Sequence, residues 1–494
     1  MAIPKRPLLH LKNQGLVDPA DDRLIELAIY DVLLPCRNFL IDHKVAVLGR
    51  TSLTAEFLLR IVKGVPGISE ADAAAFFGFN ARETSFVLAE VETPGYVERR
   101  DGRLWLTMVG DGLFRDGGSE PEIFAVESRR REVGFDLISL APERPRFLTE
   151  FELGLPELTI LDEEAAGSAA ARVPQAFRRF FSEIADRRER SQREKKDLYS
   201  VDAVASKNRF LSTVRTVVRA QASYPSSEES DLIQWRPEHE QADRPEIVSA
   251  VASFVEGLKR SCSDGDTVAY NILLTLAPEF LKDFARRDGL AVTRYYLEAI
   301  ARAGDVRADR KTAPLVGSLL LSENRKRLFD VLDYGSRPRS SVPQFVIWLA
   351  PQVPAWNATT LLDEAVAGIR KRWSGPLTDG QNEAPKSICL TVPRPPRYIQ
   401  KAFEFIGKSD VRRFPGPLEI LLVPRVAVAA LVHAPIEAPR GFAVPLGFVS
   451  FDPAVVQRTE RYVLDNLSPY VADENLHREL EAALATTPDD AGGP

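Results

Sequence analysis

Turn-forming residues divide residues 48–115 into short segments, and this spacing limits what the stretch can fold into. Pro66-Gly67, Gly78, Pro94-Gly95 and Asp101-Gly102 are the breaks. Proline lacks a backbone donor and glycine favours left-handed backbone, so a helix ends at or before such a residue. We therefore expect only short helices and tight hairpins here.

Residues beside these breaks predict where each element begins. Ser69 with Asp72, and Asn80 with Glu83, place a capping oxygen three residues before an acidic side chain, and each pair predicts a helix start. The segment GYVERRDGRLWLT alternates apolar and polar residues around Asp-Gly, which predicts a hairpin. The predicted order is helix, helix, helix, hairpin.

This order resembles the winged helix-turn-helix family over residues 48–115. The segment GYVERRDGRLWLTMVGDGLF is typical of the wing and of the helix that follows it. In that family the third helix, here residues 81–91, usually enters the major groove, and the wing touches the DNA backbone or minor groove. The resemblance implies a DNA-binding surface formed by Arg82, Thr84, Ser85, Arg99, Arg100 and Arg103.

The local charge leaves two uses of this unit open. Residues 48–115 hold eight Lys and Arg against nine Asp and Glu, a net charge of −1, whereas strong DNA binders are usually basic. The alternative is a winged helix that serves only protein contact or dimerisation. The apolar side chains predicted to form its core are Phe76, Phe77, Phe79, Phe86, Val87, Leu88 and Trp105.

The two ends of the chain give simpler predictions. Residues 1–47 are expected to hold a lead-in helix, because apolar residues in 22–43 lie mostly at helical spacing. The acidic, glycine- and proline-containing tail, residues 485–494, is expected to be disordered.

Residues 116–245 are predicted to be a mixed β connector with one charged helix. A strand pair is expected over residues 201–220, and a loop begins at Ser223. The helix over residues 174–197 carries interleaved basic and acidic residues, which favours a solvated, salt-bridged helix over a nucleic-acid arm.

The rest of the chain divides into two patterns. Residues 246–335 have apolar stripes at helical spacing, which predict a helical region. Residues 343–467 alternate strand and helix patterns, which predict an α/β domain. The predicted fold class is therefore α+β multidomain, with an N-terminal winged helix-turn-helix, a helical middle and a C-terminal α/β domain.

The segment VHAPIEAPRGFAVPLGFVS resembles the phosphodiesterase half-motif of the phospholipase D superfamily. His433 and Gly447 match the family pattern, whereas Pro435, Arg440 and Phe448 replace its lysine, aspartate and serine. In that family the histidine attacks phosphorus and the lysine binds the phosphate charge. The resemblance implies a degenerate, silent phospholipase D-like domain. His433 is catalytic only if that domain is active, and otherwise is a structural histidine on an apolar strand.

Other catalytic and metal-binding patterns are missing from the sequence. The five histidines and three cysteines are not clustered, and no phosphate-binding loop, nucleophile elbow or HExxH motif occurs. We therefore expect no metal, no cofactor and no catalytic activity. The net charge of −6 excludes a protein that coats nucleic acid with its whole surface. Neither a signal-like start nor a long apolar run occurs, which predicts a cytoplasmic protein without a membrane segment.

The sequence thus predicts a non-catalytic, cytoplasmic, bacterial DNA-binding protein, acting as a transcription regulator or as a DNA-engaging subunit of a larger assembly. Its expected partners are double-stranded DNA, further proteins of such an assembly and a second copy of the chain. The homo-oligomer is expected because one half-motif per chain leaves the paired arrangement of the superfamily to a dimer. The alternatives are a nuclease or phosphodiesterase built on the C-terminal α/β domain, and a structural protein-interaction subunit.

Overall fold

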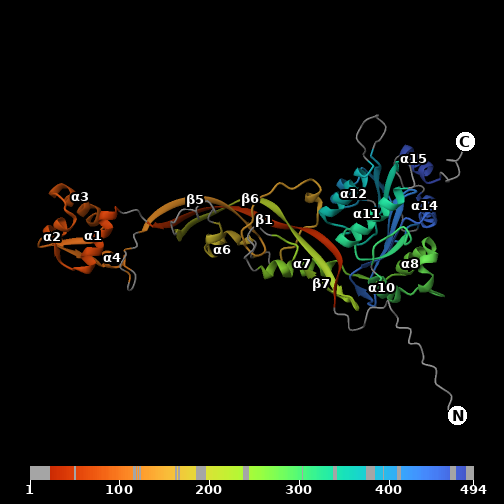
Figure 1. Cartoon of the computed structure of the whole chain (residues 1–494), viewed down its shortest axis with the longest axis horizontal. Coiled ribbons are helices and arrows are strands. Elements are labelled where there is room, and N and C mark those ends of the chain that lie inside the picture. The colour runs from red at the N-terminus through yellow and green to blue at the C-terminus, as the bar shows by residue number, and fades with distance from the viewer. Residues whose placement is uncertain are drawn as a thin grey trace, which may run out of the picture.

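The computed structural model is elongated, with a β-sheet arm between a small unit at one end and a larger α/β body at the other (Figure 1). The structure describes residues 23–48, 52–114, 118, 121, 124–161, 164, 167–184, 196–236, 244–302, 304–337, 342–373, 384–392, 394–408, 413–467 and 474–485. Apart from Ala485, the tail predicted to be disordered lies outside the described residues.

The arm is a four-stranded antiparallel sheet in the order β5, β1, β6, β7. Its strands are β1 (Leu24–Leu48), β5 (Phe124–Asp136), β6 (Lys196–Gln221) and β7 (Tyr224–Asp231). At roughly 3.3 Å per residue, β1 spans about 80 Å. β1 pairs with β6 along nearly its whole length and with β5 along its second half, so it forms the spine of the arm.

The predicted lead-in helix over residues 22–43 is wrong, because this segment is the first part of β1. Residues 27–36 are all buried. A strand covered on both faces has a continuous apolar run, and such a run lacks the alternation that distinguishes a strand from a buried helix. Pro35 has no backbone N–H, and it is tolerated in β1 because the pairing with β5 ends beside it, at Cys36. Its carbonyl still accepts a hydrogen bond from the Leu137 N–H at 2.9 Å.

The predicted strand pair over residues 201–220 is also wrong, since these residues belong to the single strand β6. No glycine or proline interrupts residues 196–221, so nothing in this segment forces a turn. The predicted loop from Ser223 is mostly the edge strand β7.

The connection from β5 to β6 contains a short 3-10 helix (Glu152–Gly154) and α6 (Ala169–Ile184). α6 is the described part of the predicted charged helix, and residues 185–195 lie outside the described residues. Phe177 and Phe180 of α6 pack against Phe39, Ile41 and Phe135 of the arm sheet, so one face of the sheet is covered by this helix.

The small unit at the end of the arm, residues 52–114, is called the tip unit here. It is inserted between β1 and β5, whose ends pair at Leu48 and Phe124. Its elements are α1 (Leu53–Gly64), β2 (Ile68–Ser69), α2 (Glu70–Phe77), α3 (Ala81–Glu92), β3 (Val97–Arg100), β4 (Arg103–Leu106) and α4 (Met108–Asp111). The predicted order of three helices and a hairpin is confirmed.

The predicted caps of the tip unit are confirmed as well. The Ser69 side chain accepts from the Asp72 N–H, and Asn80 forms a capping box with Glu83. Asp101 and Gly102 have φ values of 49° and 70°, the left-handed backbone that a two-residue turn between twisted strands requires. Local sequence therefore determines the backbone of this unit.

The body is built on a seven-stranded sheet in the order β11, β18, β16, β15, β12, β13, β14. Its strands are β11 (Thr312–Val316), β12 (Phe345–Leu349), β13 (Lys386–Thr391), β14 (Phe405–Lys408), β15 (Leu418–Val423), β16 (Ala427–Ala434) and β18 (Val444–Ser450). β12, β13 and β14 run parallel, and the other pairs are antiparallel. β15, β16 and β18 are buried at every position, so both faces of the sheet centre are covered.

The helices of the body are α7 (Pro245–Gly257), α8 (Asp264–Leu276), α9 (Pro278–Leu281), a 3-10 turn (Lys282–Phe284), α10 (Val292–Ala301), α11 (Ser322–Ser336), α12 (Thr360–Lys371), α13 (Arg397–Ala402), α14 (Pro453–Leu467) and α15 (Glu474–Ala485). Two minor ribbons join β8 (Arg260–Ser261) to β17 (Arg440–Gly441), and β9 (Ala285–Arg286) to β10 (Gly289–Leu290).

The division into a helical region and a separate α/β domain is wrong. β11, within residues 246–335, is an edge strand of the body sheet, and α7, α8 and α10 pack into the same core as that sheet. The apolar stripes of these helices are therefore buried inside the chain. Side chains buried in this way are not available for contacts with a second copy of the chain.

A buried carboxylate joins the arm to the body. Asp31 of β1 is 3% exposed. It accepts hydrogen bonds from Arg215 of β6 at 2.7 and 2.9 Å and from Thr359 and Thr360, before and at the start of α12, at 2.8 Å each. Burial alone would raise the pKa of Asp31, but the hydrogen bonds and charge of Arg215, with the Thr360 and Thr359 donors, lower it below its ordinary value.

Candidate functional site

The outer face of α3 presents two of the residues predicted to contact DNA. Arg82 and Ser85 are exposed, with Phe86 beside them, and their spacing places them on one side of the helix. Thr84 does not share this face. It is half-buried, and its hydroxyl donates to the Asn80 carbonyl at 2.9 Å.

Acidic residues of α3 are engaged within the tip unit. Glu83 accepts from the Asn80 N–H at 3.0 Å, and Glu90 accepts from the Ser52 hydroxyl. The second bond brings the start of α1 beside α3, one turn from Phe86. The outer face of α3 is therefore left with one cation, Arg82, which has no acidic partner within ion-pair distance among the described residues.

The predicted wing residue Arg99 is held by two carboxylates. Its guanidinium donates to Glu92 of α3 at 2.9 and 3.2 Å and lies 3.0 Å from Glu70 of α2. The hydrogen bond to Glu92 and the charges of both carboxylates raise the pKa of Arg99. This side chain ties the wing to two helices of its own unit.

The other two wing arginines are also engaged. Arg100 pairs with Glu98 on the same strand, and Arg103 donates to the Gly67 carbonyl at 2.9 Å. The Arg100 pair is exposed, and exposed pairs of this kind contribute only about 0 to 1 kcal/mol. A DNA phosphate would nevertheless have to compete with each of these partners.

The tip unit as a whole is acidic and carries exposed apolar side chains. Residues 52–114 hold six Lys and Arg and nine Asp and Glu. Phe76 and Phe86, predicted to be core, are 71% and 67% exposed, and Trp105 is 37% exposed. Leu53 and Met108 are exposed as well, at 71% and 94%. Helical spacing alone did not distinguish Phe76 and Phe86 from Val87 and Leu88, which are buried.

A second group of basic residues lies on α6 of the arm. Arg172, Arg178 and Arg179 are exposed on the side opposite the buried Phe177 and Phe180. No acidic side chain among the described residues forms an ion pair with any of the three, and the Arg179 guanidinium lies 5.0 Å from the centre of the Phe180 ring. Charge alternation predicted a salt-bridged helix over residues 174–197, but residues 185–195, which hold most of the alternating charges, lie outside the described residues.

His433 lies inside the body rather than in an open cleft. It is 5% exposed, and its Nε2 is 2.5 Å from Oε2 of Glu419, a carboxylate with no exposed surface. Trp348 donates its indole N–H to the other Glu419 oxygen at 2.8 Å. A nucleophile must be able to reach its substrate, and His433 is buried. Its contacts therefore indicate a structural role.

Gly447 also has a structural explanation. A Cβ at this position would lie 1.9 Å from the Ala430 carbonyl oxygen, so the close approach of β18 to β16 requires glycine. The Gly447 carbonyl accepts the Tyr295 hydroxyl at 2.5 Å. The two residues that match the phosphodiesterase pattern are thus explained by packing.

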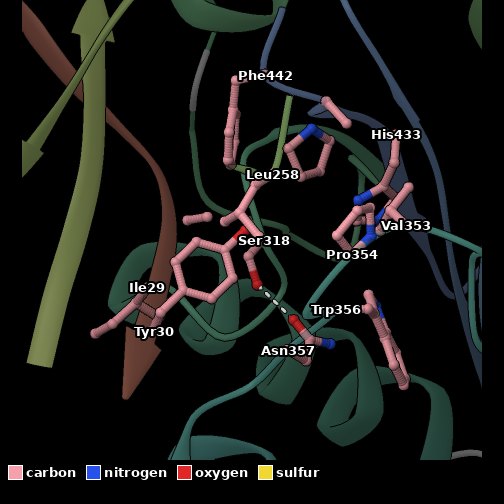
Figure 2. A pocket seen from close by; sticks show the side chains of 13 residues that line it. Ile29, Tyr30, Leu258, Ser318, Val353, Pro354, Trp356, Asn357, His433 and Phe442 are labelled. Carbon is pink, nitrogen blue, oxygen red and sulfur yellow. Dashed lines mark hydrogen bonds between the residues drawn. The ribbon is translucent and has the colours of Figure 1, made fainter. Parts of the chain in front are cut away.

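Figure 2 shows the space beside His433, walled by Tyr30 of β1, Phe442 and Trp356. The Ser318 hydroxyl donates to Asn357 Oδ1 at 3.0 Å across this space. The cavity volume is about 20 Å³, which accommodates about one water molecule. It is too small for a phosphodiester substrate.

The described residues contain no group of three or more His, Cys, Asp or Glu side chains placed to hold a metal ion. None of the described helices is long and apolar enough to cross a membrane. Comparison of the chain with protein-family models, curated proteins and solved structures gave no match.

Proposed function

We propose that this chain is a non-catalytic, DNA-engaging subunit that holds duplex DNA with its arm and presents α3 of the tip unit to it. The observation that carries the proposal is a set of exposed arginines on α6 that have no acidic partner among the described residues: Arg172, Arg178 and Arg179. A cation without an internal partner neutralises a phosphate without first breaking an ion pair, and phosphate contacts supply most of the affinity for DNA.

The charge of the surrounding arm supports this assignment. Residues 37–48, 126–134, 169–184 and 196–209 together hold eleven Lys and Arg against six Asp and Glu. A basic region on an acidic chain is the local patch that a net charge of −6 still permits.

The tip unit contributes fewer DNA contacts than the arm. As the resemblance to winged helix-turn-helix domains implies, α3 enters the major groove with Arg82 and Ser85 toward base edges or phosphates. Phe86 offers an apolar contact of the kind that a thymine methyl group accepts. Arg99, Arg100 and Arg103 mainly hold the wing in place.

The body is proposed to be a degenerate phospholipase D-like domain without activity. The burial of His433 against Glu419 supports this view, as do Pro435, Arg440 and Phe448 at the family's other positions. We also propose that the chain self-associates and takes part in a larger bacterial assembly.

Fluorescence anisotropy with the full chain and a labelled duplex of about 25 base pairs tests the function. Between about 50 and 200 mM salt, the logarithm of the affinity should fall linearly with the logarithm of the salt concentration. The same duplex, incubated with Mg²⁺, should stay intact on a gel. Absence of salt-dependent binding would refute DNA engagement, and cleavage lost in His433→Ala would refute the non-catalytic assignment.

A second function is favoured by the exposed apolar side chains of the tip unit. Leu53 and Phe86 flank the bond between Ser52 and Glu90 and offer an apolar surface on an acidic unit, which suits a protein partner with apolar and basic groups. Replacing residues 49–123 by Asn-Gly separates the two functions, because Leu48 and Phe124 already pair and such a turn closes the hairpin. Unchanged duplex affinity in this variant would assign the tip unit to protein contact.

A further inference from the structure

A pocket lies where the base of the arm meets the body. Its walls come from the start of β1 and from β6 on the arm side, and from α10, β11 and α11 on the body side. Its volume of about 460 Å³ falls within the range of small-molecule sites. The pocket is separate from α6, from the tip unit and from His433.

The pocket contains a buried cation with which no carboxylate of the described part of the chain forms an ion pair. Arg327 of α11 is 9% exposed. Its Nη1 donates to Asn324 Oδ1 at 3.0 Å, whereas its Nε is buried without a hydrogen-bond partner. No carboxylate among the described residues lies within ion-pair distance of it. Burial is the main influence on this guanidinium and lowers its pKa, although the more distant charges of Glu323 and Asp305 oppose that effect.

Asn324 fixes the direction of this guanidinium. Its side-chain nitrogen donates to the carbonyls of Val316, Gly317 and Ser318 at 2.8, 3.2 and 3.0 Å. The amide oxygen is thereby left to accept from Arg327. This hydrogen bond orients the guanidinium before any ligand arrives, and such preorganisation favours binding.

The other charged residues that line the pocket are balanced in sign: Arg23 and Arg219 against Glu26 and Glu323. Arg219 lies 3.1 Å from Glu26 and also pairs with Asp231. Glu323, one turn before Arg327 on α11, is exposed. Apolar side chains form much of the remaining wall: Leu24, Ile25, Ile300, Pro314, Val316 and Leu321. Among the described residues that line the pocket, Arg327 is thus the one buried charge without a pairing carboxylate.

We propose that this pocket binds a small organic anion, with its negatively charged oxygens on Arg327 and its apolar body against the wall formed by Leu24, Ile300 and Val316. A buried charge is normally paired, and an anion supplies the missing partner through charge-assisted hydrogen bonds. The walls belong to both arm and body, so the bound anion links the two. The inference does not depend on what the arm contacts.

Thermal unfolding and calorimetric titration of the full chain test this site with three probes of matched size: hexanoate, hexyl phosphate and hexylamine. Either anion should raise the unfolding temperature and bind, whereas hexylamine should do neither. Inorganic phosphate should bind at least about tenfold more weakly than hexyl phosphate, because it lacks the apolar body.

Arg327→Met is the informative variant, and Arg325→Met is its matched control. Arg325 lies on the same helix but pairs with Glu364 at 3.5 Å, away from the pocket. Arg327→Met should weaken anion binding at least about tenfold, while Arg325→Met should bind as the wild type does. Without ligand, Arg327→Met should unfold at the wild-type temperature or above it, because it removes an unpaired buried charge.

Three results would overturn the proposal. One is equal binding of hexanoate and hexylamine by the wild type, which needs no variant to interpret. Another is no binding of either anion at about 10 mM. The third is wild-type affinity in Arg327→Met. Retained duplex binding together with any of these results would leave the proposed function intact and reject the pocket alone.

Discussion

The arm and the tip unit each carry three arginines that a DNA phosphate could contact, and the two sets differ in their surroundings. Arg99, Arg100 and Arg103 of the wing each have an acceptor inside the tip unit. Arg172, Arg178 and Arg179 of α6 have no acidic partner among the described residues. All six side chains belong to exposed residues, so exposure does not separate the two sets.

The number of arginines on a surface is therefore a poor guide to whether that surface binds phosphate. In the tip unit, acidic residues outnumber basic ones, and the hairpin lies against α2 and α3, which bring Glu70 and Glu92 to Arg99. On α6, Glu183 is the sole acidic residue. The availability of a cation depends on which carboxylates the fold places near it.

The largest expected effect comes from removing the α6 set. Arg172→Ala, Arg178→Ala and Arg179→Ala together should reduce the salt dependence of duplex binding by about two to three units of slope, at roughly 0.9 per phosphate. Anisotropy titrations at several salt concentrations measure this slope. An unchanged slope would remove α6 from the interface and reverse the comparison.

Next in size is the loss of the arm's anchor in the body, which also controls for effects on folding. Asp31→Asn should lower the free energy of unfolding by about 2 to 4 kcal/mol, because Arg215 loses its buried counter-charge. The α6 variants, whose side chains are exposed, should change it by less than about 0.5 kcal/mol each. Denaturant unfolding, followed by circular dichroism, compares them.

The effect of Asp31 should depend on pH in a defined direction. The pKa of Asp31 is lowered in the folded protein, so its stabilisation is complete above the unfolded value of about 4 and is lost as the pH falls through the folded value. The difference between wild type and Asp31→Asn should be constant between about pH 5 and 8. It should shrink below about pH 4, and a constant difference down to pH 2 would contradict the assignment.

A smaller effect is expected from Arg82, which has no acidic partner among the described residues of the tip unit. Arg82→Ala should reduce the slope by about 0.9 if Arg82 contacts a phosphate. If it contacts a base edge, it should instead lower discrimination between duplex sequences by about 1 to 3 kcal/mol. Arg60→Ala is the control, because Arg60 pairs with Glu56 on α1. Equal behaviour of the two variants would favour protein contact by the tip unit.

The smallest effect on DNA should come from the wing. Replacing Arg99, Arg100 and Arg103 by alanine should change the slope by less than about one unit, since each has an internal partner. The triple variant should instead unfold more easily, mainly through Arg99, which links Glu70 and Glu92. A slope change as large as that of the α6 variants would show that phosphates displace these partners.

The accuracy of the sequence predictions differed between the same two regions. Ser69, Asn80 with Glu83, and Asp101-Gly102 predicted the helix starts and the turn of the tip unit correctly. In the arm, residues 22–43 were assigned to a helix and residues 201–220 to two strands, although both belong to single long strands. Leu24 pairs with Gln221 and Leu48 with Phe124, and such distant partners leave no local signal.

The candidate sites were likewise predicted where local sequence decides the structure and missed where distant segments meet. The sequence placed Arg82 and Ser85 on an exposed helix face correctly, but it did not identify the carboxylates that engage Arg99 and Arg100. It also missed the exposure of Phe76 and Phe86, because the apolar spacing of a short helix does not show which neighbour covers it. Arg327 gave no signal at all, since its pocket is formed by strands and helices that are far apart in the chain.

By itself, the sequence determined the elements whose hydrogen bonds close within a few residues: the capped helices and the hairpin of the tip unit, and most helices and strands of the body. Tertiary structure alone decided which charges are paired and which are left available. Asp31 meets Arg215 and Thr359, Glu92 meets Arg99, and Arg327 meets no carboxylate of the described residues, each through the packing of the chain. Ion pairing depends on distance in space, and only the folded chain sets that distance.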